Sequence, residues 1–216
     1  MKHMNTIAEI RKDYQQLSLT EKEVKPNPFD QFADWWNAAI HASIDEVNAM
    51  TLATASPDGI PAARIVLLKG FDANGFVFYT NYESFKGQQL AENPRACLVF
   101  FWKELERQVR ITGLVEKTST AESDDYFNSR PESSRIGAWA SPQSRVIDSR
   151  GQLEQEEKAF ARQFSGKSID RPPHWGGYRV KPGTIEFWQG RPSRLHDRIQ
   201  YALQDDGNWL IERLAP

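Results

Sequence analysis

Three basic side chains occupy alternate positions in the segment Ile185–Arg198, near the C-terminal end of the chain. They are Arg194, His196 and Arg198. If this run is extended, all three side chains project from one face of a strand. Guanidinium groups pair with phosphate or carboxylate and stack on flat rings, so the pattern predicts a site for an anionic, planar ligand. The alternative is a solvated edge strand with scattered charge.

An apolar run with a cation at each end, Arg64–Lys69, is a second candidate for ligand binding. Arg64 and Lys69 are five positions apart, so on a regular strand their side chains face opposite sides. They would then reach two different anions. The alternative is that both side chains extend to solvent from the ends of a core strand.

The end of a predicted strand at Tyr79 and Thr80 leads directly into a predicted helix that begins near Ser84 and Lys86. Free backbone N–H groups at a helix start, together with hydroxyl groups and a lysine, form a natural phosphate pocket. The alternative is a capped helix with an exposed lysine.

A second phosphate site is predicted around Tyr126, Arg130 and Ser134. Tyr126 and Arg130 are four residues apart and share a helix face, which offers a phenol, a guanidinium and a nearby hydroxyl. The alternative here is an ordinary solvated helix face.

Amide groups at Gln108 and in the turn Ser141–Ser144 can hydrogen-bond the edge of a heteroaromatic ring, although such residues are often simply on the surface. Together with Trp188 on the strand that precedes Arg194, the clusters make up two phosphate sites and one ring-binding strand. This duplication predicts a pair of ligands, each carrying a phosphate and a flat ring.

The composition is that of an ordinary globular protein, with 39% hydrophobic and 26% charged residues in 216. A net charge of −2 argues against a general nucleic-acid-binding surface. Cys97 is the only cysteine, and the four histidines are scattered, so neither a disulfide nor a metal site is expected. No apolar run is long enough for a membrane span, and the N-terminus lacks an apolar signal core, so we expect a cytoplasmic protein.

Hydrophobic periodicity predicts strands that mostly come as neighbouring hairpins, with helices at the start and in one middle block. This pattern predicts an α+β fold with an antiparallel sheet or barrel and helices to one side, in a single domain over residues 1–216. The first helix is marginal, and residues 1–20 are expected to be mobile. Helices are predicted at 4–17, from 27 to about 40, and at 84–93, 120–128, 133–139 and 150–164. Strands are predicted at 49–55, 60–69, 76–80, 95–102, 108–117, 175–180, 184–188, 198–203 and 209–213.

Eight segments stand out in order along the chain: Arg64–Lys69, Phe78–Asn81, Glu106–Gln108, Ser129–Pro131, Ile136–Trp139, Phe187–Gly190, Arg194–Arg198 and Arg213–Pro216. Together they resemble the pyridoxamine 5′-phosphate oxidase family. The resemblance implies a homodimer of antiparallel, FMN-binding split β-barrels with flanking helices, with the flavin between the subunits. It also implies oxidation of pyridoxamine or pyridoxine 5′-phosphate to pyridoxal 5′-phosphate, with O₂ as acceptor and hydrogen peroxide as product.

Site residues follow from the resemblance position by position. Arg64, Tyr79, Thr80 and Lys86 would hold the phosphate side of FMN, and Arg194 and His196 would be catalytic. The full cofactor set would be Arg64, Ile65, Val66, Leu67, Leu68, Lys69, Tyr79, Thr80, Lys86, Gln108, Gln143, Ser144, Trp188 and Arg198. The substrate set would be Arg11, Tyr14, Lys69, Tyr126, Arg130, Ser134, Arg194 and His196, with Arg11 and Tyr14 on an N-terminal segment that closes over the site.

The chain departs from the family pattern at Phe85, where a basic residue often precedes the lysine matched by Lys86. Loss of one countercharge to a phosphate costs about 1–3 kcal/mol. Two alternatives stay open: another flavin or deazaflavin enzyme on the same barrel, and a non-catalytic protein that stores FMN or pyridoxal phosphate. The Arg194 and His196 pair and the second phosphate site argue against the first alternative, whereas Phe85 leaves the second one open.

Overall fold

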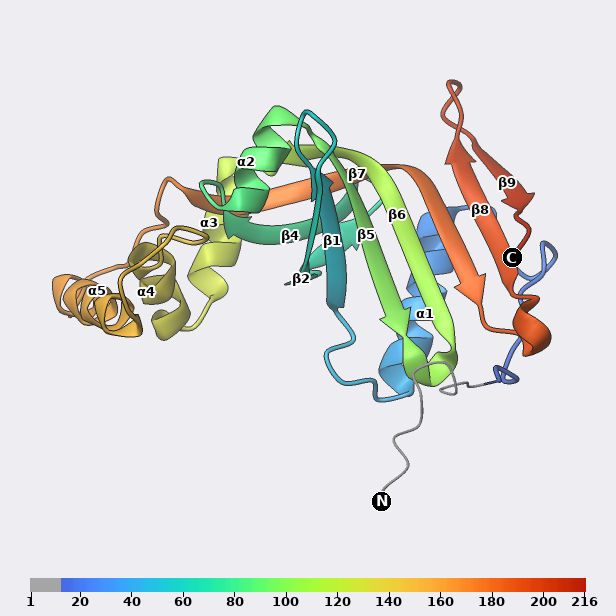
Figure 1. Ribbon diagram of the computed structural model, residues 1–216, viewed down its shortest axis with the longest axis horizontal. Helices are drawn as coiled ribbons and strands as arrows, with labels where there is room; N and C mark the ends of the chain where they lie inside the picture. The colour runs from blue at the N-terminus through green and yellow to red at the C-terminus, as the bar shows by residue number, and fades with distance from the viewer. Residues whose placement is uncertain (1–12) are drawn as a thin grey trace, which may run out of the picture. The chain divides into compact units, whose positions relative to one another are not determined.

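The structure is a computed structural model that describes residues 13–216. Contacts divide the chain into two compact units, each built from separate segments. Unit 1 comprises the described residues up to Val47 together with Val99–Ile111 and Gly183–Pro216, and unit 2 comprises Asn48–Leu98 and Thr112–Pro182. Three strands run from one unit into the other: β5 (Arg95–Trp102), β6 (Arg107–Lys117) and β7 (Trp175–Gln189) (Figure 1).

In unit 2, hairpins build a sheet with the strand order β2-β1-β5-β6-β7-β4-β3. The pairs β1–β2, β3–β4 and β4–β7 are antiparallel. The β1–β2 turn is tight because Gly59 adopts a φ of 86°, which residues with a Cβ rarely take. The strands that belong wholly to this unit are β1 (Ala49–Ala55), β2 (Pro61–Leu67), β3 (Gly70–Asp72) and β4 (Gly75–Asn81).

Serine caps start three of the four helices of unit 2, since the hydroxyls of Ser84, Ser119 and Ser149 accept hydrogen bonds from backbone N–H groups three residues ahead. The third and fourth helices, α4 and α5, lie side by side (Figure 1). A core of Phe127, Ile136, Ile169 and Trp175 holds this region together. The helices are α2 (Phe85–Glu92), α3 (Thr120–Ser129), α4 (Glu132–Ala140) and α5 (Arg150–Gln163).

Unit 1 is organised around the helix α1 (Pro28–His41), which Asn27 caps. Its Phe32 packs against Phe100 and Trp102 of β5, and its Trp35 packs edge-on against Phe187 of β7. The sheet continues through two strands, β8 (Asp197–Leu203) and β9 (Trp209–Arg213), and β8 pairs antiparallel with both β7 and β9. Two short 3₁₀ turns, η2 (Lys103–Leu105) and η3 (Pro192–Arg194), complete the unit.

The strands predicted at 175–180 and 184–188 are one continuous strand, β7, so their separation was wrong. Residues Trp175–Val180 pair with β4, whereas Thr184–Gln189 pair with β8. Pro182 lies between these two ladders, where its missing N–H costs neither ladder a hydrogen bond. The sequence signal Pro182–Gly183 therefore marks the point at which β7 changes its pairing partner from β4 to β8.

The condition that the run from Arg194 to Arg198 is extended is not met, because η3 occupies Pro192–Arg194 and β8 begins only at Asp197. Ser193 and Arg194 have positive φ values of 56° and 62°, so the chain turns there and the alternation of a strand does not apply. The helix predicted at 4–17 lies mostly outside the described residues, and residues 13–17 are not helical. Within residues 13–216, no helix is both long and apolar enough to cross a membrane.

Candidate functional site

A cavity of about 520 Å³ in unit 2 collects most of the candidate residues of that unit. Four of its lining side chains are cations, and none of the described residues that line it is an aspartate or glutamate. A cavity with this charge excess selects an anionic ligand. The lining residues are Arg64, Ile65, Val66, Leu67, Lys69, Tyr79, Thr80, Lys86, Tyr126, Arg130, Pro131, Ser134, Gln143 and Trp175.

One cluster in the cavity joins the helix start at Lys86 to the end of β4. The Nζ atom of Lys86 donates to Gln143 Oε1 at 2.9 Å and to Thr80 Oγ1 at 3.2 Å. Thr80 Oγ1 also donates to Gln143 Oε1, at 3.1 Å. An ammonium and a hydroxyl thus converge on one acceptor oxygen, which is the arrangement that a phosphate oxygen requires.

Arg64 is held in place by groups on β1. Its Nη1 atom donates to Thr54 Oγ1 at 2.6 Å and to Leu52 O at 3.2 Å, and Thr54 in turn donates to the buried Gln89. Burial lowers the pKa of Arg64. Burial, and secondarily the charge of Arg64, lowers the pKa of Lys86 to about 8. The Arg64 shift reflects loss of hydration alone, whereas the Lys86 shift also reflects the nearby positive charge of Arg64.

Aromatic rings and a guanidinium form a second cluster in the same cavity. The rings of Tyr79 and Tyr126 stack with centroids 3.9 Å apart, and Trp175 stacks 5.5 Å from Tyr79. The Arg130 guanidinium lies 4.6 Å from the centroid of the Trp175 ring. Its Nη1 atom is buried and has no hydrogen-bond partner among the described residues. A buried N–H group without a partner is costly, so this atom is the strongest local indication of a missing acceptor.

Arg64 and Lys69 line the same cavity, so the expectation that they face opposite sides was wrong. The reason is that β2 ends at Leu67, and Lys69 lies in the bend before β3. Two members of the expected cofactor set that belong to unit 2 are absent from the lining: Leu68 is 4% exposed, and Ser144 lies beside Gln143 with a φ of 72°. Trp175 and Pro131 line the cavity although the sequence analysis named neither as a site residue.

The remaining candidates lie in unit 1. Trp188 and His196 have ring centroids 4.6 Å apart, and Tyr14 packs edge-on against both rings at 5.8 Å and 6.0 Å. The backbone N–H of Arg191 donates to His196 Nδ1, so the hydrogen of the neutral ring is on Nε2. Burial, and secondarily the charge of Arg194, lowers the pKa of His196, which favours this neutral form.

Arg198 is held by Glu186, a buried carboxylate on β7 that the sequence analysis did not single out. The Arg198 Nε atom donates to Glu186 Oε1 at 2.8 Å, and Arg110 Nη1 lies 3.2 Å from Glu186 Oε2. This pairing raises the pKa of Arg198. Gln108 lies in the part of β6 that belongs to the same unit. Arg11 lies outside the described residues.

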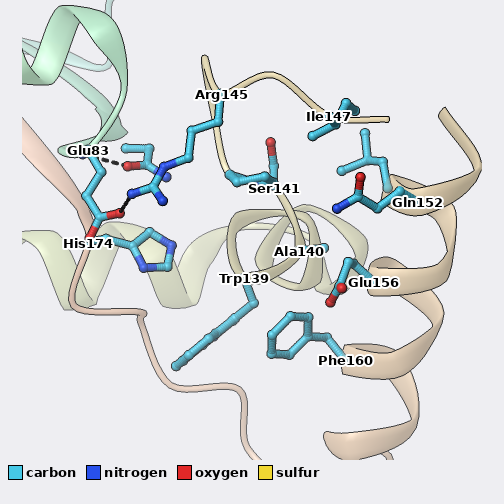
Figure 2. A pocket seen from close by; sticks show the side chains of 13 residues that line it. Glu83, Trp139, Ala140, Ser141, Arg145, Ile147, Gln152, Glu156, Phe160 and His174 are labelled. Atoms are coloured by element: carbon cyan, nitrogen blue, oxygen red, sulfur yellow. Dashed lines mark hydrogen bonds and ion pairs between the residues drawn. The ribbon is translucent and has the colours of Figure 1, made fainter. Parts of the chain in front are cut away.

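A second cavity of about 330 Å³ in unit 2 differs in character from the first. Figure 2 shows Arg145 extending to Glu83, with which it forms a 2.8 Å ion pair, and Trp139 beside Phe160. Glu156 adds another carboxylate to the lining, so this cavity has no excess of positive charge. Of these two cavities, the first is the one with an excess of positive charge.

Comparison with known families assigns both halves of the chain. Residues 37–161 match the family model described as pyridoxamine 5′-phosphate oxidase. Residues 175–216 match the model described as the pyridoxine 5′-phosphate oxidase C-terminal dimerisation region. Together the two matches include every candidate site residue except Arg11 and Tyr14.

Curated relatives match over nearly the full length. Proteins named pyridoxine/pyridoxamine 5′-phosphate oxidase from Nostoc sp. and Paraburkholderia phymatum are each 60% identical to this chain. The first alignment covers 98% of this chain and 99% of the relative, and the second covers 99% and 100%.

Solved structures show the same fold. PhzG from Burkholderia lata, solved in complex with tetrahydrophenazine-1-carboxylic acid, has a TM-score of 0.87 at 28% identity, covering 95% of this chain and 100% of that one. A pyridoxamine 5′-phosphate oxidase-related, FMN-binding protein from Nostoc punctiforme has a TM-score of 0.68 at 21% identity, covering 93% and 100%. The expected α+β, antiparallel split β-barrel with flanking helices is confirmed. The chain belongs to the pyridoxamine 5′-phosphate oxidase family of enzymes.

Proposed function

We propose that this chain oxidises pyridoxamine 5′-phosphate and pyridoxine 5′-phosphate to pyridoxal 5′-phosphate, with FMN as cofactor and O₂ as the electron acceptor that becomes hydrogen peroxide. The observation that carries the proposal is the cavity of unit 2, which has four cationic side chains and no carboxylate in its described lining. Relatives that are 60% identical over nearly the whole chain carry the name of this activity, which supports the same conclusion.

The lining residues fit the phosphate and the ring of FMN. Lys86 and Thr80 already donate to one common acceptor, and Arg64 provides a second cation near Lys86. Ile65 and Leu67 of β2 present apolar side chains that are 64% and 37% exposed, against which a flat ring would bury apolar surface. Phe85, which is 54% exposed, carries no charge. Arg64 and Lys86 are therefore the two cations that we assign to this phosphate.

The second cluster fits the phosphate of the substrate. Arg130 has an unpartnered N–H group that a phosphate oxygen would satisfy, and Lys69, Tyr126 and Ser134 line the same cavity. We assign these four residues to the substrate phosphate. Two anions that bind in one cavity repel each other, so separate groups of cations are needed to bind both.

Arg194 and His196 are proposed to bind and orient the substrate ring. The neutral His196 ring offers the Nε2 hydrogen as a donor, and the Arg194 guanidinium adds further donors that orient the substrate ring. When bound, FMN would supply the hydride acceptor opposite the substrate C4′ atom and the route of the electrons to O₂. The role of the chain is to align the two rings, keep water out and neutralise both phosphates.

The cofactor set proposed in unit 1 consists of Gln108, Trp188 and Arg198. Glu186 holds the Arg198 guanidinium through Nε, while Nη1 donates to Ala215 O at 2.7 Å. These two bonds fix the plane of the guanidinium, so Nη2 can be directed at a cofactor oxygen or nitrogen.

A homodimer with the flavin between its subunits is part of the proposal. The match of residues 175–216 to a dimerisation region supports it. Large apolar side chains also remain exposed on unit 2, including Ile60 at 62% and Leu114 at 53%, and a second copy of the chain would cover them. The single domain and the cytoplasmic location predicted from the sequence stay predictions.

The direct test is to mix the purified protein with FMN and pyridoxamine 5′-phosphate in air and to measure pyridoxal 5′-phosphate and hydrogen peroxide together. We expect equal amounts of the two products. Pyridoxamine without its phosphate is the matched control and should react poorly at the same concentration. Binding of FMN without any product would contradict the proposal and would favour a storage protein instead.

A further inference from the structure

Glu106 has an unusual combination of burial and backbone conformation. The residue is 2% exposed, and its φ of 54° lies in the left-handed region, where glycine or asparagine is normally found. A non-glycine residue in this conformation costs about 1–3 kcal/mol, so other contacts of this residue have to offset that cost.

The carboxylate of Glu106 binds the backbone of the N-terminal segment. Its Oε2 atom accepts hydrogen bonds from the N–H groups of Gln15 at 3.0 Å and Gln16 at 3.3 Å. Two consecutive N–H groups on one buried carboxylate oxygen hold the backbone at this point in one orientation. Residues further along are held by other groups, since Leu17 O accepts from Arg191 and Leu19 N donates to Asp197.

The backbone carbonyl of Glu106 binds the residues next to the Tyr14 ring. It accepts a hydrogen bond from Gly190 N at 2.7 Å and another from Gln189 Nε2 at 3.2 Å. A Cβ atom at Gly190 would lie only 2.7 Å from Cγ of the Tyr14 ring, so the missing side chain makes room for that ring. Glu106 thus contacts both the segment that carries Tyr14 and the glycine beneath its ring.

We propose that Glu106 is a positioning residue that sets Tyr14 on the Trp188 and His196 rings and so completes the substrate side of the site. This inference rests on the proposed function, because it takes His196 as a substrate contact. The residue acts through the backbone of Gln15 and Gln16 and through Gly190, and it takes no part in the chemistry. The chemical requirement is an acceptor oxygen at this position, which glutamine also supplies.

The test uses the full-length FMN-loaded protein and two variants, Glu106→Ala and Glu106→Gln. Hydrogen exchange of the amides of Gln15 and Gln16 is followed by mass spectrometry, with a peptide from β8 as the internal control. We expect exchange at these amides to accelerate about tenfold or more in Glu106→Ala and to stay near the wild-type rate in Glu106→Gln. The β8 peptide should not change. An unchanged exchange rate of these amides in Glu106→Ala would show that the Glu106 carboxylate does not hold the backbone of Gln15 and Gln16.

Kinetics supply the second readout. We expect the KM for pyridoxamine 5′-phosphate to rise about tenfold in Glu106→Ala, with kcat lowered less, and Glu106→Gln to restore it. Faster amide exchange with an unchanged KM would show that Glu106 holds the backbone of Gln15 and Gln16 without affecting substrate binding, and would overturn the proposal. A protein that shows no oxidase activity at all would instead refute the proposed function, and the exchange data would still decide the anchor.

A variant that leaves Glu106 intact covers the case in which Glu106→Ala does not fold. Gly190→Ala displaces the Tyr14 ring by steric contact and should raise the KM to a similar degree. In a Tyr14→Ala background the added methyl group meets no ring, so Gly190→Ala should have little further effect. Additive effects of the two substitutions would mean that Gly190 acts independently of Tyr14, and would contradict the proposed arrangement.

Discussion

The amide oxygen of Gln143 lies 2.9 Å from the Nζ atom of Lys86, where an oxygen of a bound phosphate would be expected. Thr80 donates to the same oxygen. This contact places the Gln143 side chain beside the position proposed for the FMN phosphate.

Gln143→Glu should weaken FMN binding, because the new carboxylate pairs with Lys86 and repels the phosphate at close range. We expect the FMN dissociation constant to rise about tenfold to a hundredfold, which corresponds to about 1.4–2.8 kcal/mol. Titration of apoprotein, followed by quenching of flavin fluorescence, measures this. The melting temperature of the apoprotein serves as the control and should not fall, since the substitution adds an ion pair. Unaltered FMN affinity would show that Gln143 is not at the phosphate position.

FMN affinity should fall as the pH rises above about 8, the pKa to which burial and Arg64 lower Lys86. A bound phosphate favours the charged amine, so binding above this pH requires proton uptake, and the affinity is fully retained only below it. Between pH 7 and pH 9 the dissociation constant should rise about tenfold. The arginine side chain in Lys86→Arg stays charged over this pH range, so the FMN dissociation constant of this variant should change less with pH. The same slope in both proteins would assign the titration to another group.

Arg130→Ala should raise the KM for pyridoxamine 5′-phosphate about tenfold to a hundredfold, because it removes a charge-assisted contact to the substrate phosphate. The KM for pyridoxamine without phosphate should hardly change. Arg130→Lys is the matched control: it restores the charge but not the planar fork, so an intermediate KM is expected. A parallel loss for both substrates would mean that Arg130 supports the cavity without binding the phosphate.

If the site is shared between subunits, two variants with substitutions in different parts of the site should regain activity when they are mixed. One chain carries Lys86→Ala and Arg130→Ala, and the other carries Arg194→Ala and His196→Ala. Each mixed dimer would then contain one intact site, and random exchange of subunits should restore about a quarter of the wild-type activity. Steady-state turnover before and after mixing measures this. Absence of any recovery, with mixed dimers verified by mass spectrometry, would mean that each subunit builds its site alone.

Local signals in the sequence were sufficient for most helices and strands. Ser84 caps a helix as predicted, and helices begin at Pro28 and Arg150 close to their predicted starts. The strands Arg95–Trp102 and Trp209–Arg213 have the predicted bounds. Caps, turns and alternation act over a few residues, so they can be read without knowledge of distant partners. The continuity of β7 was not predicted, because strand partners far along the chain decide it.

The sequence by itself determined the types of residue in the site, the order of the elements and the family, since matching segments occur along nearly the whole chain. Only the tertiary structure decided that Arg64 and Lys69 line one cavity with Lys86 and Arg130, and that Arg130 has a buried N–H group without a partner. It also revealed the contacts of Glu106 with Gln15 and Gln16. The physical reason is that the charge excess of a cavity and the satisfaction of a buried polar group depend on residues distant in sequence, which folding brings together.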